Sequence, residues 1–175
     1  MTKSRTQHIF KAMIVFAWIA FIGFLITSGS ILISYCVSWI NPDGARNLYK
    51  GLDLFGLRES NFWHYTQAVS LVLTVSIMKA VIAYQAISLL SKLNIQNPFT
   101  LEVSQRIEKI SRLTVGLWIV NMLSSAYMKY LTNETESIRV TFFSTDLILI
   151  VGVLFIVSQI FKRGVEMQSE NELTV

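Results

Sequence analysis

Three polar side chains interrupt the apolar stretches of this 175-residue sequence, and their types could support chemistry. Lys79 and Asp146 are ionisable, and Asn121 carries an amide that both donates and accepts hydrogen bonds. Ionisable groups inside a bilayer are costly, and they commonly form ligand sites, proton relays or buried ion pairs. Lys79 is therefore either a structural lysine bound to carbonyl groups or a carboxylate, or part of a ligand or proton site.

Small residues surround Lys79 on a helical wheel, and such residues mark the faces at which helices approach closely. These residues are Ser76, Ala80, Ala83 and Ala86. We therefore expect Lys79 to face other helices and not the lipid.

A polar stripe with spacings of three and four residues follows later in the chain. Its members are Thr114, Asn121, Ser124, Ser125 and Met128. Hydrogen bonds between helices are the simplest role for this stripe, because small polar residues commonly join helices inside a bilayer.

Asp146 is the carboxylate that could neutralise a lysine within the membrane. The depth of Asp146 differs from that of Lys79 by about six residues, or about 9 Å along a helix. Lys129 lies at a closer level, which slightly favours an Asp146–Lys129 pair over an Asp146–Lys79 pair. Either pair would hold helices together first and act as a functional switch second.

Four long apolar stretches must position these side chains. The first contains no charged residue from Ala12 to Pro42, whereas about 20 apolar residues in a helix suffice to cross a bilayer core. Only 15% of the residues are charged, well below the quarter that is typical of soluble domains. We predict an all-α membrane fold, an antiparallel bundle of four transmembrane helices, with spans at about residues 12–40, 62–90, 113–131 and 140–161.

The distribution of Lys and Arg predicts the orientation of these helices, because cytoplasmic loops carry an excess of basic residues. One side of the predicted bundle has Lys3, Arg5, Lys11, Lys92, Arg106, Lys109, Arg112, Lys162 and Arg163, and the other has Arg46, Lys50, Arg58, Lys129 and Arg139. Both termini are therefore expected in the cytoplasm. The same spread of basic residues argues against direct nucleic-acid binding, which needs them clustered on one soluble face.

The first loop is predicted to contain a short amphipathic helix. Asn41-Pro42 stops the first membrane helix, because the residue before a proline disfavours helical geometry. Leu48, Leu52 and Phe55 then form an apolar stripe at helical spacing. This stripe predicts a short helix on the outer face, and an irregular loop is the alternative.

The second loop is also predicted to contain a short amphipathic helix. Thr100 can cap a helix whose first turn carries Glu102, a favourable place for an acidic residue. From Leu101 to Arg112 this helix either lies in the headgroup region or continues straight into the third span.

The sequence contains no catalytic or metal-binding constellation. Its two histidines are His8 in the N-terminal tail and His64 at the outer interface, and Cys36 is its one cysteine. Gly-rich phosphate loops, nucleophile elbows and zinc-binding histidine pairs are missing as well. We therefore expect neither enzymatic activity nor a metal or cofactor.

Two segments, taken together, resemble a known family. The first is Asn97-Pro98-Phe99-Thr100 with Glu102 and Arg106, and the second runs from Phe161-Lys162-Arg163-Gly164 to Leu173-Thr174-Val175. Over essentially its whole length, the chain resembles a family of small bacterial four-helix membrane proteins of unknown function. Genes of that family often neighbour one for a small Cro/C1-type helix-turn-helix protein. The resemblance implies a multi-pass protein of the bacterial cytoplasmic (inner) membrane with a transcription regulator as its partner.

Both matching segments are predicted to lie in the cytoplasm, where they form a candidate docking surface for the regulator. This surface consists of Asn97, Pro98, Phe99, Thr100, Glu102, Arg106, Arg163, Gly164, Glu166, Glu170 and Leu173. The expected partners are the lipid bilayer, the regulator and a second copy of the chain in a homo-oligomer.

Two other functions compete with this regulatory hypothesis. The first is a small transporter or ligand-binding membrane protein that uses the intramembrane residues Lys79, Asn121, Ser125, Lys129 and Asp146. The second is a structural or immunity protein without a ligand. Uptake by proteoliposomes favours the transporter, and a co-purifying helix-turn-helix protein favours the regulatory partner.

Overall fold

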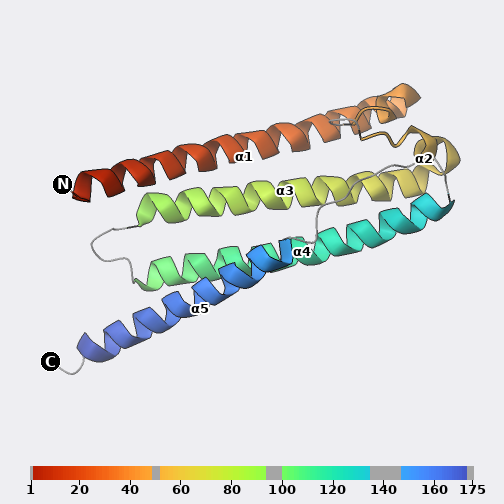
Figure 1. The fold of residues 1–175 in the computed structure, drawn as a ribbon. Helices are drawn as coiled ribbons and strands as arrows, with labels where there is room; N and C mark the ends of the chain where they lie inside the picture. Colours follow the sequence, from red (N-terminus) through yellow and green to blue (C-terminus); the bar gives the residue numbers. More distant parts are fainter. Residues whose placement is uncertain (1, 49–51, 94–99, 135–146, 173–175) are drawn as a thin grey trace. The chain divides into compact units, whose positions relative to one another are not determined.

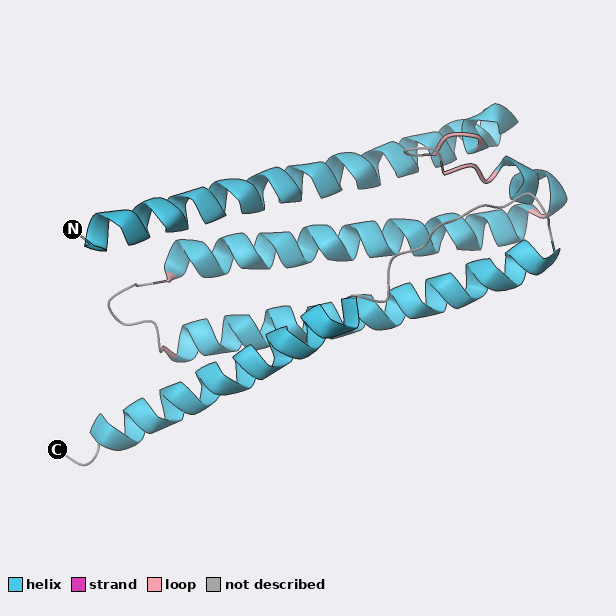
Figure 2. Cartoon of the chain, in the orientation of Figure 1, coloured by secondary structure: helices cyan, strands magenta, loops and turns pink. Residues whose placement is uncertain are grey.

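The computed structural model covers residues 1–175 and describes all of them except 1, 49–51, 94–99, 135–146 and 173–175. The described residues form five α-helices and one short 3₁₀ helix and contain no β-strand (Figure 1, Figure 2). The helices are α1 (Thr2–Ile40), η1 (Pro42–Ala45), α2 (Phe55–Ser60), α3 (Phe62–Lys92), α4 (Leu101–Glu134) and α5 (Leu147–Glu172). The prediction of an all-helical fold is confirmed.

Two of these helices contain segments that are long and apolar enough to cross a membrane. The segment His8–Ile40 of α1 has a mean hydropathy of 2.4 in its most apolar window, and that window contains no buried residue. The corresponding value for α3 is 1.7, and a third of its window is buried. Both helices coincide with predicted spans, and α3 continues to Lys92 instead of ending near residue 90.

The predicted stop of α1 is found at the expected residue. The helix ends at Ile40, and the Asn41 Oδ1 atom accepts a hydrogen bond from the Asp43 amide at 3.1 Å. The chain then turns tightly through η1. A Cβ atom at Gly44 would lie 3.0 Å from the backbone nitrogen of Ser38, so that a larger residue would force this turn away from α1.

The helix of the first loop begins later than its apolar stripe predicts. The Asp53 Oδ1 atom accepts a hydrogen bond from the Phe55 amide at 2.9 Å, which satisfies a free donor at the start of α2. Leu48 and Leu52 lie before this point and are joined outside the helix by a backbone hydrogen bond of 3.1 Å. The first loop therefore combines a short helix with irregular chain.

The prediction of a separate amphipathic helix in the second loop is wrong. The alternative, a helix that continues straight into the third predicted span, is correct. The residues from Leu101 to Arg112 form the first third of the continuous helix α4. The Thr100 Oγ1 atom accepts a hydrogen bond from the Val103 amide at 3.3 Å, and Glu102 lies in the first turn, as predicted. No proline follows Thr100 within α4, so that nothing ends the helix before it enters its apolar part.

One side of α4 is buried along almost its whole length. Its buried positions alternate at spacings of four and three residues: Val103, Ile107, Ile110, Thr114, Leu117, Asn121, Ser124, Met128 and Leu131. This heptad pattern is typical of helices that pack side by side at a small angle. The stripe therefore joins the apolar face of Leu101–Arg112 to the polar stripe predicted farther along the helix.

The chain forms two compact units. Unit 1 consists of Met1–Phe21, Val81–Trp118 and Thr145–Val175, and unit 2 consists of Ile22–Ala80 and Ile119–Ser144. Unit 1 therefore contains the start of α1, the end of α3, the start of α4 and α5. Unit 2 contains the rest of α1, α3 and α4 together with η1 and α2.

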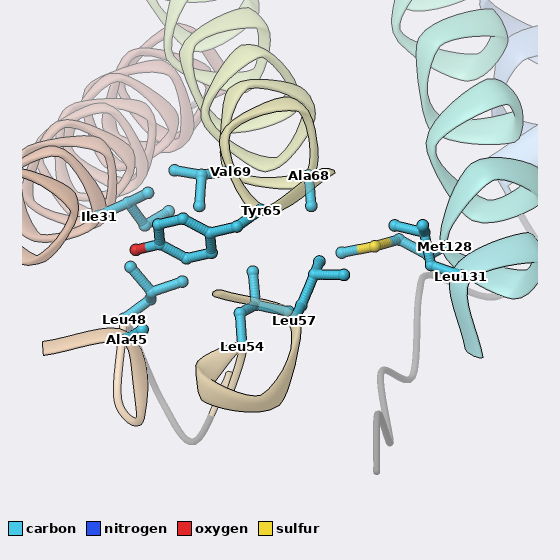
Figure 3. Packing of buried hydrophobic residues seen from close by; sticks show 10 residues of the cluster. All are labelled: Ile31, Ala45, Leu48, Leu54, Leu57, Tyr65, Ala68, Val69, Met128 and Leu131. Carbon is cyan, nitrogen blue, oxygen red and sulfur yellow. The ribbon is translucent and has the colours of Figure 1, made fainter. Parts of the chain in front are cut away.

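The core of unit 2 holds the first loop against the long helices. Tyr65 of α3 is fully buried at its centre, and the Tyr65 hydroxyl donates a hydrogen bond to Ser38 Oγ of α1 at 2.8 Å. Figure 3 shows the other apolar side chains of the buried cluster to which Tyr65 belongs. They are Ile31, Ala45, Leu48, Leu54, Leu57, Ala68, Val69, Met128 and Leu131.

Candidate functional site

A cluster of charged side chains in unit 1 joins the end of α3 to the start of α4. The Glu102 Oε1 atom accepts hydrogen bonds from Lys92 Nζ at 2.9 Å and from Arg106 Nε and Nη2 at 3.2 and 2.9 Å. Glu102 and Arg106 are four residues apart and therefore lie on one face of α4. Lys92 is the last residue of α3, so that its bond to Glu102 crosses between the helices.

Arg106 adds a second contact between the same two helices. Its Nη1 atom donates a hydrogen bond to Ser88 Oγ of α3 at 2.6 Å. The Arg106 side chain is only 22% exposed, whereas the Lys92 and Glu102 side chains are more than half exposed. A guanidinium that is bonded on two sides loses little further freedom when it binds a ligand.

A polar pocket of about 370 Å³ lies beside this cluster. It is lined by Gln85 of α3 and by Glu102, Gln105, Arg106 and Lys109 of α4. Two cations therefore face the pocket together with one carboxylate, and that carboxylate is already paired with Lys92 and Arg106. The pocket offers amide, guanidinium and ammonium donors, which is chemistry suited to an anion.

The ion cluster predicts a pH dependence. The hydrogen bonds from Lys92 and from Arg106 lower the pKa of the Glu102 carboxyl. These bonds to the ionised Glu102 stabilise the folded state. Their contribution is fully present above the ordinary Glu pKa of about 4.3 and is lost as the pH falls through the lower pKa of the folded state. We expect a carboxyl NMR titration to place Glu102 below that ordinary value. Lys92→Met should raise the Glu102 pKa, and Lys129→Met in unit 2 should leave it unchanged.

The predicted intramembrane residues have different environments. Lys79 is partly buried on α3, and Ser76, Ala80 and Ala83 beside it are buried. Asn121 is 6% exposed, and its Oδ1 atom accepts no hydrogen bond within the described part of the chain. Lys129 is exposed and Ser125 is partly buried. Asp146 and its predicted ion pairs lie outside the described residues.

Within the described residues, the hydroxyl groups of the polar stripe on α4 donate to their own helix and not, as predicted, to a second one. Thr114, Ser124 and Ser125 each donate a hydrogen bond of 2.7–2.8 Å to the carbonyl four residues earlier in α4. A hydroxyl in a helix reaches this carbonyl without help from a second helix. Within unit 2, a serine pair instead joins α1 to α3, because Ser28 Oγ donates to Ser76 Oγ at 2.9 Å.

A second polar network in unit 2 was not predicted. The Tyr127 hydroxyl of α4 bonds both to Gln67 Oε1 and to His64 Nδ1 of α3, the latter at 2.9 Å. A phenol has one proton, and it goes to the Gln67 oxygen, so that His64 Nδ1 carries a proton and donates. His64 and Gln67 are three residues apart and therefore lie on one face of α3. This spacing was the only sign of a shared polar partner that the sequence offered.

The second part of the predicted docking surface lies on α5. Arg163 Nη1 forms an ion pair with Glu166 Oε2 at 3.0 Å, and the side chain of Glu170 is exposed one turn later. Gly164 and Glu166 are partly buried. Asn97, Pro98, Phe99 and Leu173 lie outside the described residues. Thr100, Glu102 and Arg106 belong to unit 1, which also contains α5.

No metal centre is found among the residues that the structure describes. Within these ranges, no group of three or more His, Cys, Asp or Glu side chains could hold a metal ion. The free Cys36 is exposed on α1.

Comparison with known proteins gives a family match. The model of a family described as "Protein of unknown function (DUF2975)" matches residues 42–175, a range that begins at η1 and leaves out α1. Searches of curated proteins and of solved structures found no match. The match confirms the resemblance to a family of unknown function, and the regulator encoded nearby stays a prediction.

Proposed function

We propose, from the premise that the chain belongs to the DUF2975 family of proteins of unknown function, that it is a membrane-bound partner of a cytoplasmic regulator. In this proposal four helices cross the bacterial cytoplasmic membrane, and both termini face the cytoplasm. The cytoplasmic ends of α4 and α5 dock a helix-turn-helix transcription regulator and hold it at the membrane.

The exposed side chains of α1 support insertion into a bilayer. Large apolar residues are exposed along the helix, among them Phe16, Ile19, Ile22, Leu25, Ile26, Leu32 and Ile33. These positions fall on several sides of the helix, far beyond the single stripe that a water-soluble helix buries. A helix that is apolar all round is stable in lipid.

The grouping of helix ends in unit 1 supports four antiparallel spans. Both ends of the chain and both helix ends that flank the second loop belong to this unit. Four antiparallel spans require this grouping, because the termini and the second loop then lie on the same side of the membrane. Unit 1 also contains all nine basic residues assigned to the cytoplasm.

The observation that carries the docking proposal is the length of α4 and α5. Helix α4 begins at Leu101, twelve residues before its apolar part starts at Leu113, and α5 continues from Phe161 to Glu172. Twelve helical residues extend about 18 Å, which a membrane anchor does not need. Helical ends that are rich in charge and project beyond the apolar part provide a rigid surface for a protein partner.

A pull-down from native membranes in mild detergent tests this proposal. The parent protein should co-purify with a helix-turn-helix protein, and Glu170→Lys should reduce its yield, because it reverses an exposed charge on the α5 part of the docking surface. Glu59→Lys is the matched control, since Glu59 is an exposed glutamate on α2, outside the proposed surface. Absence of a helix-turn-helix protein from the parent eluate, or equal losses in both variants, would contradict docking.

A second function is favoured by one observation in unit 2. The buried Asn121 Oδ1 atom is an acceptor without a protein donor in the described residues, and a ligand with an N–H or O–H group would satisfy it. A small transporter or ligand-binding protein would use this atom together with Lys79. Proteoliposome uptake that is lost in Asn121→Leu would favour this function over docking.

A further inference from the structure

We infer that the polar pocket between α3 and α4 binds the phosphate group of an anionic ligand, with an inner-leaflet phospholipid as its source in the membrane. The inference goes beyond the proposed function and does not depend on a regulator. It rests on the charge of the pocket, on the preorganisation of Arg106 and on the position of the lining residues at the edge of the predicted membrane spans.

The charge of the pocket selects an anion. Glu102 is the one carboxylate of the lining, and its Oε1 atom already accepts three hydrogen bonds from Lys92 and Arg106. The guanidinium of Arg106 has five N–H groups, of which three donate to Glu102 and Ser88. Two N–H groups of Arg106 and the exposed ammonium of Lys109 are left to neutralise a ligand. A phosphate, with several acceptor oxygens, suits donors that arrive from two directions.

Arg106 is held in place before a ligand arrives. Its bonds to Glu102 on α4 and to Ser88 on α3 fix both ends of the guanidinium. Binding therefore does not have to order this long side chain, which lowers the entropic cost of association. Glu102 acts as a positioning residue, because it orients Arg106 and not the ligand.

The pocket spans the boundary between apolar and polar chain. Gln85 lies five residues, or about 8 Å, before Leu90, where the uncharged part of the second predicted span ends. Lys109 lies just before the apolar part of α4 begins at Leu113. This boundary is the level of phospholipid headgroups, where basic residues attract anionic lipids.

The size of the pocket fits a headgroup better than a bare ion. Its volume of about 370 Å³ lies within the range of ligand sites. The amides of Gln85 and Gln105 can hydrogen-bond the phosphate oxygens or the hydroxyl groups of a glycerol headgroup. Gln85 is partly buried on α3.

The test measures lipid binding by the full-length protein in neutral phosphatidylcholine nanodiscs. Short-chain phosphatidylglycerol is titrated in, with phosphatidylcholine as the neutral comparison. We expect saturable binding of phosphatidylglycerol that Lys109→Gln weakens roughly fivefold. Gln85→Leu should weaken it as well without changing the charge. Arg112→Gln is the matched control, because Arg112 is an exposed cation on the same helix that does not line the pocket.

A second arm identifies the source of the phosphate. Competition by millimolar inorganic phosphate would assign the site to a soluble phosphate compound, and binding that persists would assign it to the lipid. Both results support a phosphate site. The inference is overturned if neither probe binds, or if Arg112→Gln weakens binding as much as Lys109→Gln, since the attraction would then be diffuse.

Discussion

Truncation of Leu57 to alanine is expected to lower the free energy of unfolding by about 2–5 kcal/mol. Leu57 of α2 is only 2% exposed and belongs to the same buried cluster as Tyr65 and Met128 (Figure 3). Removing its isopropyl end leaves a cavity that a cluster drawn from several helices cannot fill by moving one of them. The change can be measured by titrating the purified protein in mixed micelles with a denaturing detergent and following helical content.

Leu123→Ala provides the matched control. Leu123 lies on α4 in the same unit, and its side chain is 61% exposed, so that the same chemical change creates no internal cavity. We expect its effect to stay within about 0.5 kcal/mol. Equal losses in the two variants would show that α2 does not pack into the core of unit 2.

The first loop, which contains Leu57, shows which parts of its structure could be predicted from the sequence. The stop at Asn41-Pro42 is a local property of two residues, and α1 ends where they predict. The start of α2 depends on the Asp53 side chain, which bonds the Phe55 amide and excludes Leu48 and Leu52 from the helix. The spacing of apolar residues indicates that a short helix exists, but it does not show which turn nucleates it.

The second loop shows the opposite case: the sequence allowed either a separate helix or one that continues into the third span, and the structure has the continuous helix. The change from charged to apolar residues at Arg112 and Leu113 predicts a membrane boundary, but it does not decide whether a helix ends there. Backbone hydrogen bonds do not depend on side-chain polarity, so that α4 continues through this point.

The candidate site was predictable only in part, for a geometric reason. Glu102 and Arg106 are four residues apart, and their pairing follows from one helix alone. The bonds to Lys92 and Ser88 depend on how α3 and α4 are rotated about their own axes. A single sequence does not specify that rotation, and the pocket that results from it was therefore not foreseen.

Substitutions of Asn121 are the second change with a large expected effect on the free energy of unfolding. The sign of this effect depends on the residue that replaces Asn121. Asn121→Leu should raise the free energy of unfolding by about 1–2 kcal/mol, because it removes a buried Oδ1 atom that accepts no hydrogen bond in the described residues. In the proposed four-span arrangement, Asn121→Asp should lower it by roughly 2.5–3.5 kcal/mol, the approximate cost of a carboxylate at the centre of a membrane helix. Aspartate has nearly the same volume as asparagine, so that the added charge accounts for the expected loss in Asn121→Asp.

The same detergent titration measures both variants, and its result separates the two candidate functions. A stabilised Asn121→Leu protein that still co-purifies with the proposed regulator indicates that Asn121 has no ligand role. Stabilisation combined with lost uptake would assign the Oδ1 atom to a substrate, because functional sites keep polar groups that cost stability. An Asn121→Asp protein as stable as the parent would contradict the expected charge penalty. It would instead show that a cation within unit 2 reaches the new carboxylate, and Lys79 is the residue to test next.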